Sequence, residues 1–89
     1  MTNKALKLFE LTGDNCIVTG GAGLLGRVFA DALADAGATV FLFDIDDIAL
    51  EEVSNLLKKK HGKKIQPILC DITRQESVRE SVTFAAQTG

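Results

Sequence analysis

The sequence lacks tyrosine and tryptophan altogether and has one histidine, one proline and two cysteines in 89 residues. Two cysteines are too few for a disulfide framework or a cysteine metal site. Cys16 and Cys70 fall in predicted strands, where we expect them to be buried as small apolar side chains. The one histidine, His61, stands among lysines at the end of a predicted helix, and we expect a solvated capping residue there rather than a catalytic one.

Long apolar runs and a strong charge are also missing. No apolar run approaches the roughly 20 residues of a membrane-spanning helix, and the start of the chain has no signal-peptide core. The formal net charge of -2 gives no reason to expect nucleic acid or an anionic membrane as a partner. We therefore expect a cytoplasmic protein. Its length suffices for one small domain, 1–89, which we interpret below as a partial one.

A glycine-rich stretch, Thr19-Gly20-Gly21-Ala22-Gly23-Leu24-Leu25-Gly26, follows the apolar run Cys16-Ile17-Val18 and opens a helical pattern. A strand followed by a glycine turn and a helix is the context of a dinucleotide-binding site. The turn needs residues that tolerate positive φ, and a diphosphate must approach the backbone closely. The N–H groups at the helix start would face the phosphates. This stretch therefore predicts a dinucleotide site.

Strand and helix patterns alternate along the rest of the chain. The predicted strands are 15–19, 39–44 and 65–70, and the predicted helices are 24–36, 47–60 and a third that starts with a capping box at Thr73–Glu76. Asp46 is the predicted N-cap of the second helix. Alternation of this kind implies right-handed crossovers and a parallel sheet. We predict an α/β, Rossmann-type β-α-β-α-β-α fold with three parallel strands in the order 3-2-1, half of a doubly wound sheet.

Helical spacing also predicts which side chains are buried. The expected inward positions are Leu25, Phe29, Ala32, Leu33 and Ala36 in the first helix, Ala49, Val53, Leu56 and Leu57 in the second, and Val78, Val82 and Ala85 in the third. Residues 1–13 form a lead-in whose apolar side chains (Leu6, Leu8, Phe9 and Leu11) can pack on the sheet edge.

Two aspartates end predicted strands, where ligands of such sheets bind. Asp44, 18 residues after Gly26, can accept hydrogen bonds from the adenosine ribose, and its charge would repel a 2′-phosphate, so NAD is favoured over NADP. The alternative is a carboxylate that caps the next helix. Asp71 could meet the adenine edge with Ile72 against the ring, or it could simply form a turn. Arg27 faces a phosphate or, as we expect, solvent.

The predicted cofactor contacts come from the glycine turn and from the two later strand ends. They are Gly20, Gly23, Leu24, Leu25, Gly26, Asp44, Ile45, Asp71 and Ile72. We predict no metal ligands and no catalytic residues in this chain.

From about Leu8 to Gly89 the chain resembles the N-terminal half of the short-chain dehydrogenase/reductase family. Thr19-Gly20 matches the start of the family's T-G-x-x-x-G-x-G, and Gly26 matches its third glycine. The family's middle glycine falls at Leu24, so the spacing here fits the T-G-x-x-G-x-x-G variant of the extended branch. The segment Cys70-Asp71-Ile72-Thr73 is similar to that of the shorter branch.

The resemblance implies hydride transfer between a nicotinamide and an alcohol or carbonyl. The family's acid/base residue is the Tyr of Y-x-x-x-K, helped by a Ser and an N-N-A-G region, and none of these is in this sequence. The residues given end where the family's fourth strand would begin, which leaves the first strand as an apolar edge. We therefore expect either part of a longer enzyme or a chain that completes its sheet through a partner, as a homo-oligomer.

Two functions follow from this sequence. The favoured one is the NAD-binding portion of a short-chain oxidoreductase, whose small-molecule substrate would bind only to a longer parent chain. The alternative is a stand-alone nucleotide-binding or regulatory module without catalysis. A remnant whose glycines form only a structural turn is a third possibility.

Overall fold

A computed structural model describes residues 13–88 and contains three strands and three α-helices within that range. In chain order the elements are β1 (Asn15–Thr19), α2 (Leu24–Asp35), β2 (Thr39–Asp44), α3 (Asp47–His61), the 3-10 turn η1 (Gly62–Lys64), β3 (Ile65–Leu69) and α4 (Gln75–Thr88). The bounds predicted from the sequence agree to within about two residues. The expected packing of Leu6, Leu8, Phe9 and Leu11 concerns residues outside the described range.

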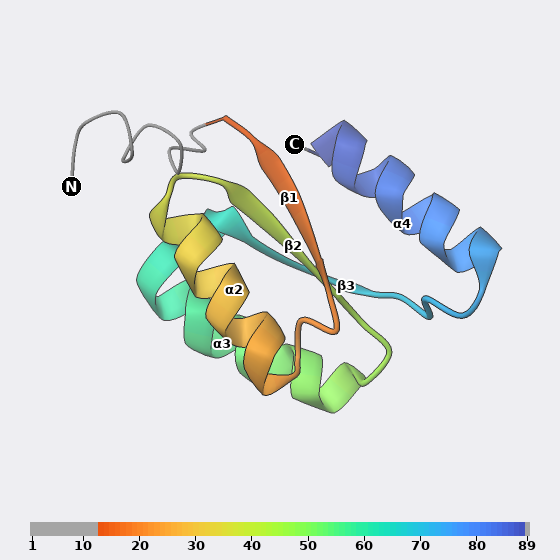
Figure 1. Ribbon diagram of the computed structural model, residues 1–89, viewed down its shortest axis with the longest axis horizontal. Coiled ribbons are helices and arrows are strands. Elements are labelled where there is room, and N and C mark those ends of the chain that lie inside the picture. Colours follow the sequence, from red (N-terminus) through yellow and green to blue (C-terminus); the bar gives the residue numbers. More distant parts are fainter. Residues whose placement is uncertain (1–12, 89) are drawn as a thin grey trace.

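The three strands form one parallel sheet in the order β1-β2-β3, which confirms the predicted order 3-2-1. β2 is the central strand, with Phe41 opposite Ile17 of β1 and Gln66 of β3. Figure 1 shows α2 and α3 on one side of this sheet and α4 on the other. β1 is therefore an edge strand in the part of the chain that the structure describes.

β2 is buried on both faces, as its continuous apolar sequence predicts. Val40 and Leu42 point toward α2 and α3, whereas Phe41 and Phe43 point toward α4. Each of these four side chains is almost fully buried. The larger core, under α2 and α3, consists of Val18, Ala30, Ala34, Ala38, Val40, Leu42, Leu50, Leu57 and Ile65. The smaller core, under α4, consists of Phe41, Phe43, Cys70 and Ala85.

The inward face of α2 agrees with the predicted one only in part, since Leu33 packs against the larger core as predicted. Leu25 and Phe29 are 66% and 54% exposed, and the residues against the sheet are Gly26, Ala30 and Ala34. Small side chains let the helix approach the sheet closely. The larger side chains of Leu25 and Phe29 instead lie on the exposed side of the helix. We call Leu25, Phe29 and the exposed Ala32 the α2 flank.

The predicted faces of α3 and α4 were right in part. In α3, Leu57 is buried as predicted, but the centre of the buried face is at Leu50 and Ser54, and Leu56 is half exposed. In α4, Ala85 is buried and Val78 packs at the edge of the smaller core. Val82 is 42% exposed, and Ser81 takes the inward position beside it. A helical pattern alone leaves such shifts of one residue open, because neighbouring positions differ by only about 100° around the axis.

One predicted helix start is confirmed and the other is wrong. The Asp46 carboxylate accepts a hydrogen bond from the Ala49 N–H at 3.1 Å, so it caps α3 as predicted. The capping box at Thr73–Glu76 does not form, because α4 begins only at Gln75. The Thr73 hydroxyl instead donates to Asp71, which holds these residues in a turn before the helix. Among the described helices, none combines the length and the apolar character that a bilayer crossing requires.

Candidate cofactor site

The glycine turn connects β1 to α2 and has strict steric limits. Gly20 has a φ of 67°, which side-chain-bearing residues rarely adopt. The Gly23 N–H donates to the Gly20 carbonyl at 3.0 Å, and Gly23 then stands as the N-cap of α2. A Cβ on Gly26 would lie 2.3 Å from that same carbonyl oxygen. The turn is therefore closed tightly onto the first turn of the helix.

Gly21 also belongs to this turn, although the sequence predicted no cofactor contact for it. A Cβ there would lie 2.9 Å from the Cβ of Leu42 in β2. The Gly21 N–H donates to the Phe43 carbonyl at 3.1 Å, which extends the β1-β2 pairing into the turn. The pair of adjacent glycines after Thr19 was the available signal, since a close backbone approach to a neighbouring strand requires a residue without a side chain.

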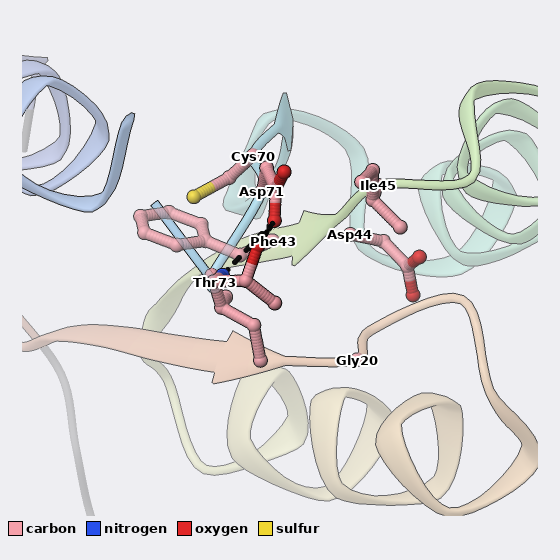
Figure 2. A pocket seen from close by; sticks show the side chains of 8 residues that line it. Gly20, Phe43, Asp44, Ile45, Cys70, Asp71 and Thr73 are labelled. Carbon is pink, nitrogen blue, oxygen red and sulfur yellow. Dashed lines mark hydrogen bonds between the residues drawn. The ribbon is translucent and has the colours of Figure 1, made fainter. Parts of the chain in front are cut away.

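Asp44 lies at the end of β2 and contacts the glycine turn. Its Oδ2 accepts the Ala22 N–H at 3.0 Å, and its Oδ1 accepts the Asp46 N–H at 3.0 Å. In Figure 2 the carboxyl group lies over the segment that leads from Gly20 into the helix. Helix capping is performed by Asp46 and not by Asp44, so the alternative role considered for Asp44 does not describe its position.

Asp71 follows β3 and forms a turn with Thr73. Its Oδ1 accepts both the hydroxyl and, at 2.9 Å, the backbone N–H of Thr73. Both hydrogen bonds lower the pKa of the Asp71 carboxyl, and the bond from the hydroxyl has the larger effect. Its backbone N–H donates to the Ser77 hydroxyl at 3.1 Å, which ties the turn to α4. The carboxylate is therefore both a turn residue and a charge fixed at the end of the sheet.

These strand ends enclose a cavity of about 250 Å³. Its walls come from the segments after all three strands, as in other parallel sheets whose ligands bind at this edge. Figure 2 shows the side chains around it. The lining residues are Gly20, Phe43, Asp44, Ile45, Cys70, Asp71, Ile72 and Thr73.

The structure thus brings five of the nine predicted contact residues into one cavity. Gly23 and Gly26 lie in the adjoining turn, whereas Leu24 and Leu25 are exposed in the first turn of α2 and do not line the cavity. Arg27 lines a separate groove between α2 and α3, away from the cavity.

Three cavity residues were not predicted as contacts: Phe43, Cys70 and Thr73. Phe43 and Cys70 directly precede the predicted aspartates Asp44 and Asp71, and Thr73 lies two residues after Asp71. That proximity in the sequence was the only signal for them.

The two cysteines were expected to be buried. Cys70 is buried as expected, whereas Cys16 is half-buried. The pKa of the Cys16 thiol is raised mainly by its partial burial and secondly by the negative charge of Asp14.

His61 is not the solvated residue that the sequence predicts. Its side chain is 5% exposed, and its Nε2 lies 2.7 Å from Oδ1 of Asp31 in α2. The Lys60 ammonium lies 3.3 Å from Asp31 and 3.2 Å from Asp35. Asp31, Asp35 and His61 are metal-ligand types whose ligand atoms lie within 4.8 Å of one another, but the lysine already contacts both carboxylates. The cluster is therefore an ion-pair network between α2 and α3.

The parallel β-α-β-α-β order, the glycine turn at a helix start and the cavity at the strand ends define a nucleotide-binding protein of Rossmann type. The family model described as short chain dehydrogenase matches residues 14–88. The chain belongs to the short-chain dehydrogenase/reductase family.

Similar proteins agree with this assignment. The chain is 36% identical over 78 residues to a short chain dehydrogenase/reductase of Colletotrichum higginsianum, covering 88% of this chain and 29% of that protein. It resembles the crystal structure of an NADPH-dependent 3-quinuclidinone reductase from Rhodotorula rubra, with a TM-score of 0.85 and 31% identity over 99% of this chain and 33% of the other. A short chain dehydrogenase/reductase from Burkholderia phymatum in complex with NAD gives a TM-score of 0.81 at 26% identity, over 88% of this chain and 27% of the other.

The chain therefore spans about a third or less of the length of these relatives. What it shares with them is the N-terminal, cofactor-binding region of the family.

Proposed function

We propose that the chain is the NAD-binding portion of a short-chain dehydrogenase/reductase that transfers a hydride between a nicotinamide and an alcohol or carbonyl substrate. The observation that carries this proposal is the position of the Asp44 carboxylate, which stands in the cavity wall and touches the glycine turn. A ribose-binding carboxylate beside a diphosphate-binding turn is the arrangement that a dinucleotide requires.

Each part of the site suits one part of the cofactor. The diphosphate would lie at the start of α2, where Gly23 and Gly26 leave the backbone N–H groups accessible and the helix end is partially positive. Asp44 would accept hydrogen bonds from the adenosine ribose, with Ile45 beside it. Asp71 and Ile72 would bind the adenine edge and face. When bound, the dinucleotide supplies the nicotinamide that gives or takes the hydride.

The preference for NAD over NADP rests on charge. Asp44 is half-buried and both of its oxygens accept backbone N–H bonds, so its charge is held in the cavity wall. A 2′-phosphate placed near it would be repelled. Both cofactors occur among the relatives of this chain: the Rhodotorula enzyme is NADPH-dependent, and the Burkholderia protein was solved in complex with NAD.

The hydride transfer itself belongs to a longer parent chain. The sequence has no tyrosine to serve as the family's acid/base residue, and we propose that residues 1–89 form a partial domain. The parent reading frame tests this: N-N-A-G followed by Y-x-x-x-K after residue 89 supports the enzyme, and a stable product that stops at residue 89 supports a nucleotide-binding module. A cytoplasmic location and a homo-oligomeric assembly are further parts of the proposal.

Titration of the full chain with NAD and, separately, with NADP tests the cofactor assignment. We expect saturable shifts of the backbone amide signals of residues 20–26 and 44 with NAD and much weaker ones with NADP. Tighter binding of NADP would overturn the role given to Asp44. A folded chain that binds neither dinucleotide would overturn the proposed function.

A further inference from the structure

We propose that Asp44 also acts as a positioning residue that holds the glycine turn in the shape that receives a diphosphate. This inference rests on the proposed function and deepens it. In the usual interpretation a carboxylate at this position only recognises ribose. Here the same carboxylate is bonded to the turn itself before any nucleotide enters.

Two hydrogen bonds join the turn to the end of β2. The Gly21 N–H donates to the Phe43 carbonyl at 3.1 Å, and the Ala22 N–H donates to Oδ2 of Asp44 at 3.0 Å. The first bond continues the sheet. The second bond depends on a side chain, and it fixes Ala22, the residue directly before Gly23, which is the N-cap of α2.

The carboxylate is itself held in place. Its other oxygen, Oδ1, accepts the Asp46 N–H at 3.0 Å, so both oxygens have backbone donors and the plane of the group is set. Each carboxylate oxygen can accept a second hydrogen bond. Asp44 can therefore accept ribose hydroxyls and keep its bond to Ala22 at the same time.

A consequence follows for cofactor specificity. To admit a 2′-phosphate, the Asp44 carboxylate would have to move or be removed, and the Ala22 N–H would then lose its acceptor. An asparagine cannot replace it, because an amide has one oxygen and a donor nitrogen where two acceptors are needed. We infer that a substitution made to admit NADP also loosens the turn that binds the diphosphate.

The test compares two ligands and two variants of the full chain. The ligands are adenosine diphosphate and 2′,3′-dideoxyadenosine diphosphate, which has the same adenine and diphosphate but no ribose hydroxyl. The variants are Asp44→Ala, which removes both acceptor oxygens, and, as a control, Asp46→Asn, which removes a nearby charge while an asparagine can still cap α3. Calorimetry measures the Kd of each ligand for the wild-type chain and for each variant. Backbone amide NMR spectra test whether each variant is folded.

If Asp44 holds the turn, Asp44→Ala weakens binding of the dideoxy ligand about tenfold, the effect expected when one hydrogen bond to a charged group is lost. Asp46→Asn leaves that Kd within about twofold, since its charge is exposed and screened. If Asp44 only recognises ribose, Asp44→Ala leaves the Kd of the dideoxy ligand unchanged or lowers it, because a negative charge near the diphosphate is gone. That result overturns the inference.

A second measurement needs no variant and no ligand. In the NMR spectrum of the wild-type chain, a coupling transmitted through the hydrogen bond should join the Ala22 amide nitrogen to the Asp44 carboxyl carbon. Its absence in a folded chain overturns the inference. A chain that shows this coupling but binds neither diphosphate ligand would instead overturn the proposed function and leave the positioning contact standing.

Discussion

The Nε2 atom of His61, the last residue of α3, lies 2.7 Å from Oδ1 of Asp31 in the middle of α2. With the two Lys60 ion pairs, this contact joins the helices that cover the larger core. The hydrogen bonds from His61 and Lys60 lower the pKa of the Asp31 carboxyl, and the bond from His61 has the larger effect. The network therefore links the stability of the fold to pH.

The contribution of Asp31 to stability should disappear in acid. Its pKa is lower in the folded chain than in the unfolded one, so the contribution is present above the ordinary carboxyl pKa and is lost as the pH falls through the folded pKa. We expect Asp31→Asn to lower the free energy of unfolding near neutral pH by less than about 1 kcal/mol, because the carboxylate is partly exposed and screened. The difference from wild type should shrink at low pH in urea unfolding. A difference for Asp31→Asn that stayed constant with pH would contradict the network.

Alanine substitutions at two turn glycines should have different effects. At Gly26 a Cβ would press on the Gly20 carbonyl oxygen and on the Gly21 backbone, so Gly26→Ala must displace the turn. At Gly20 there is room for a Cβ and only the positive φ is unfavourable. We expect Gly20→Ala to cost about 1–2 kcal/mol of unfolding free energy. We expect Gly26→Ala to cost at least about 2 kcal/mol, and to abolish diphosphate binding in a chain that still folds. Equal effects of the two on ligand affinity would contradict the steric argument.

The α2 flank and the β1 edge should make the isolated chain associate. Leu25 and Phe29 are more than half exposed, and β1 pairs only with β2 among the described residues. Exposed apolar side chains and an open strand edge each promote association. We expect sedimentation velocity to show concentration-dependent association, reduced in Leu25→Gln and Phe29→Gln. Ile48→Gln, at an exposed apolar residue of α3, is the control that should leave it unchanged. A wild-type chain that sediments as a monomer would count against both the association and the expected need for a partner.

The Thr73 hydroxyl should control the ionisation of Asp71. It is the larger of the two hydrogen-bond effects that lower the pKa of this carboxyl, and the backbone N–H of the same residue is the other. Thr73→Val should therefore raise the Asp71 pKa part of the way toward its ordinary value. Titration of the Asp71 carboxyl carbon by NMR measures this. The control is Thr83→Val, which removes a hydroxyl within α4 that donates to the Arg79 carbonyl and not to Asp71. An unchanged Asp71 pKa in Thr73→Val would show that the backbone bond alone holds the charge.

Most of the fold was predictable because its signals are local. The apolar run of β2, the glycines at turns and the Asp46 cap each act through residues within a few positions of one another. Such patterns give the element order and, with right-handed crossovers, the strand order. Asp44 and Asp71 could be placed at one edge of the sheet for the same reason, since parallel strands end together.

The remaining features depended on distances across the fold. The sequence by itself determined the family, the alternation of strands and helices, and the two aspartates at the strand ends. Only the tertiary structure decided that Ala30 and Ala34, rather than Leu25 and Phe29, face the sheet, because close helix-to-sheet packing favours the smaller side chains. It also decided that His61 is buried against Asp31, 30 residues away, and that Asp44 bonds Ala22, 22 residues away. No local pattern encodes such contacts, because they exist only once separate elements have packed together.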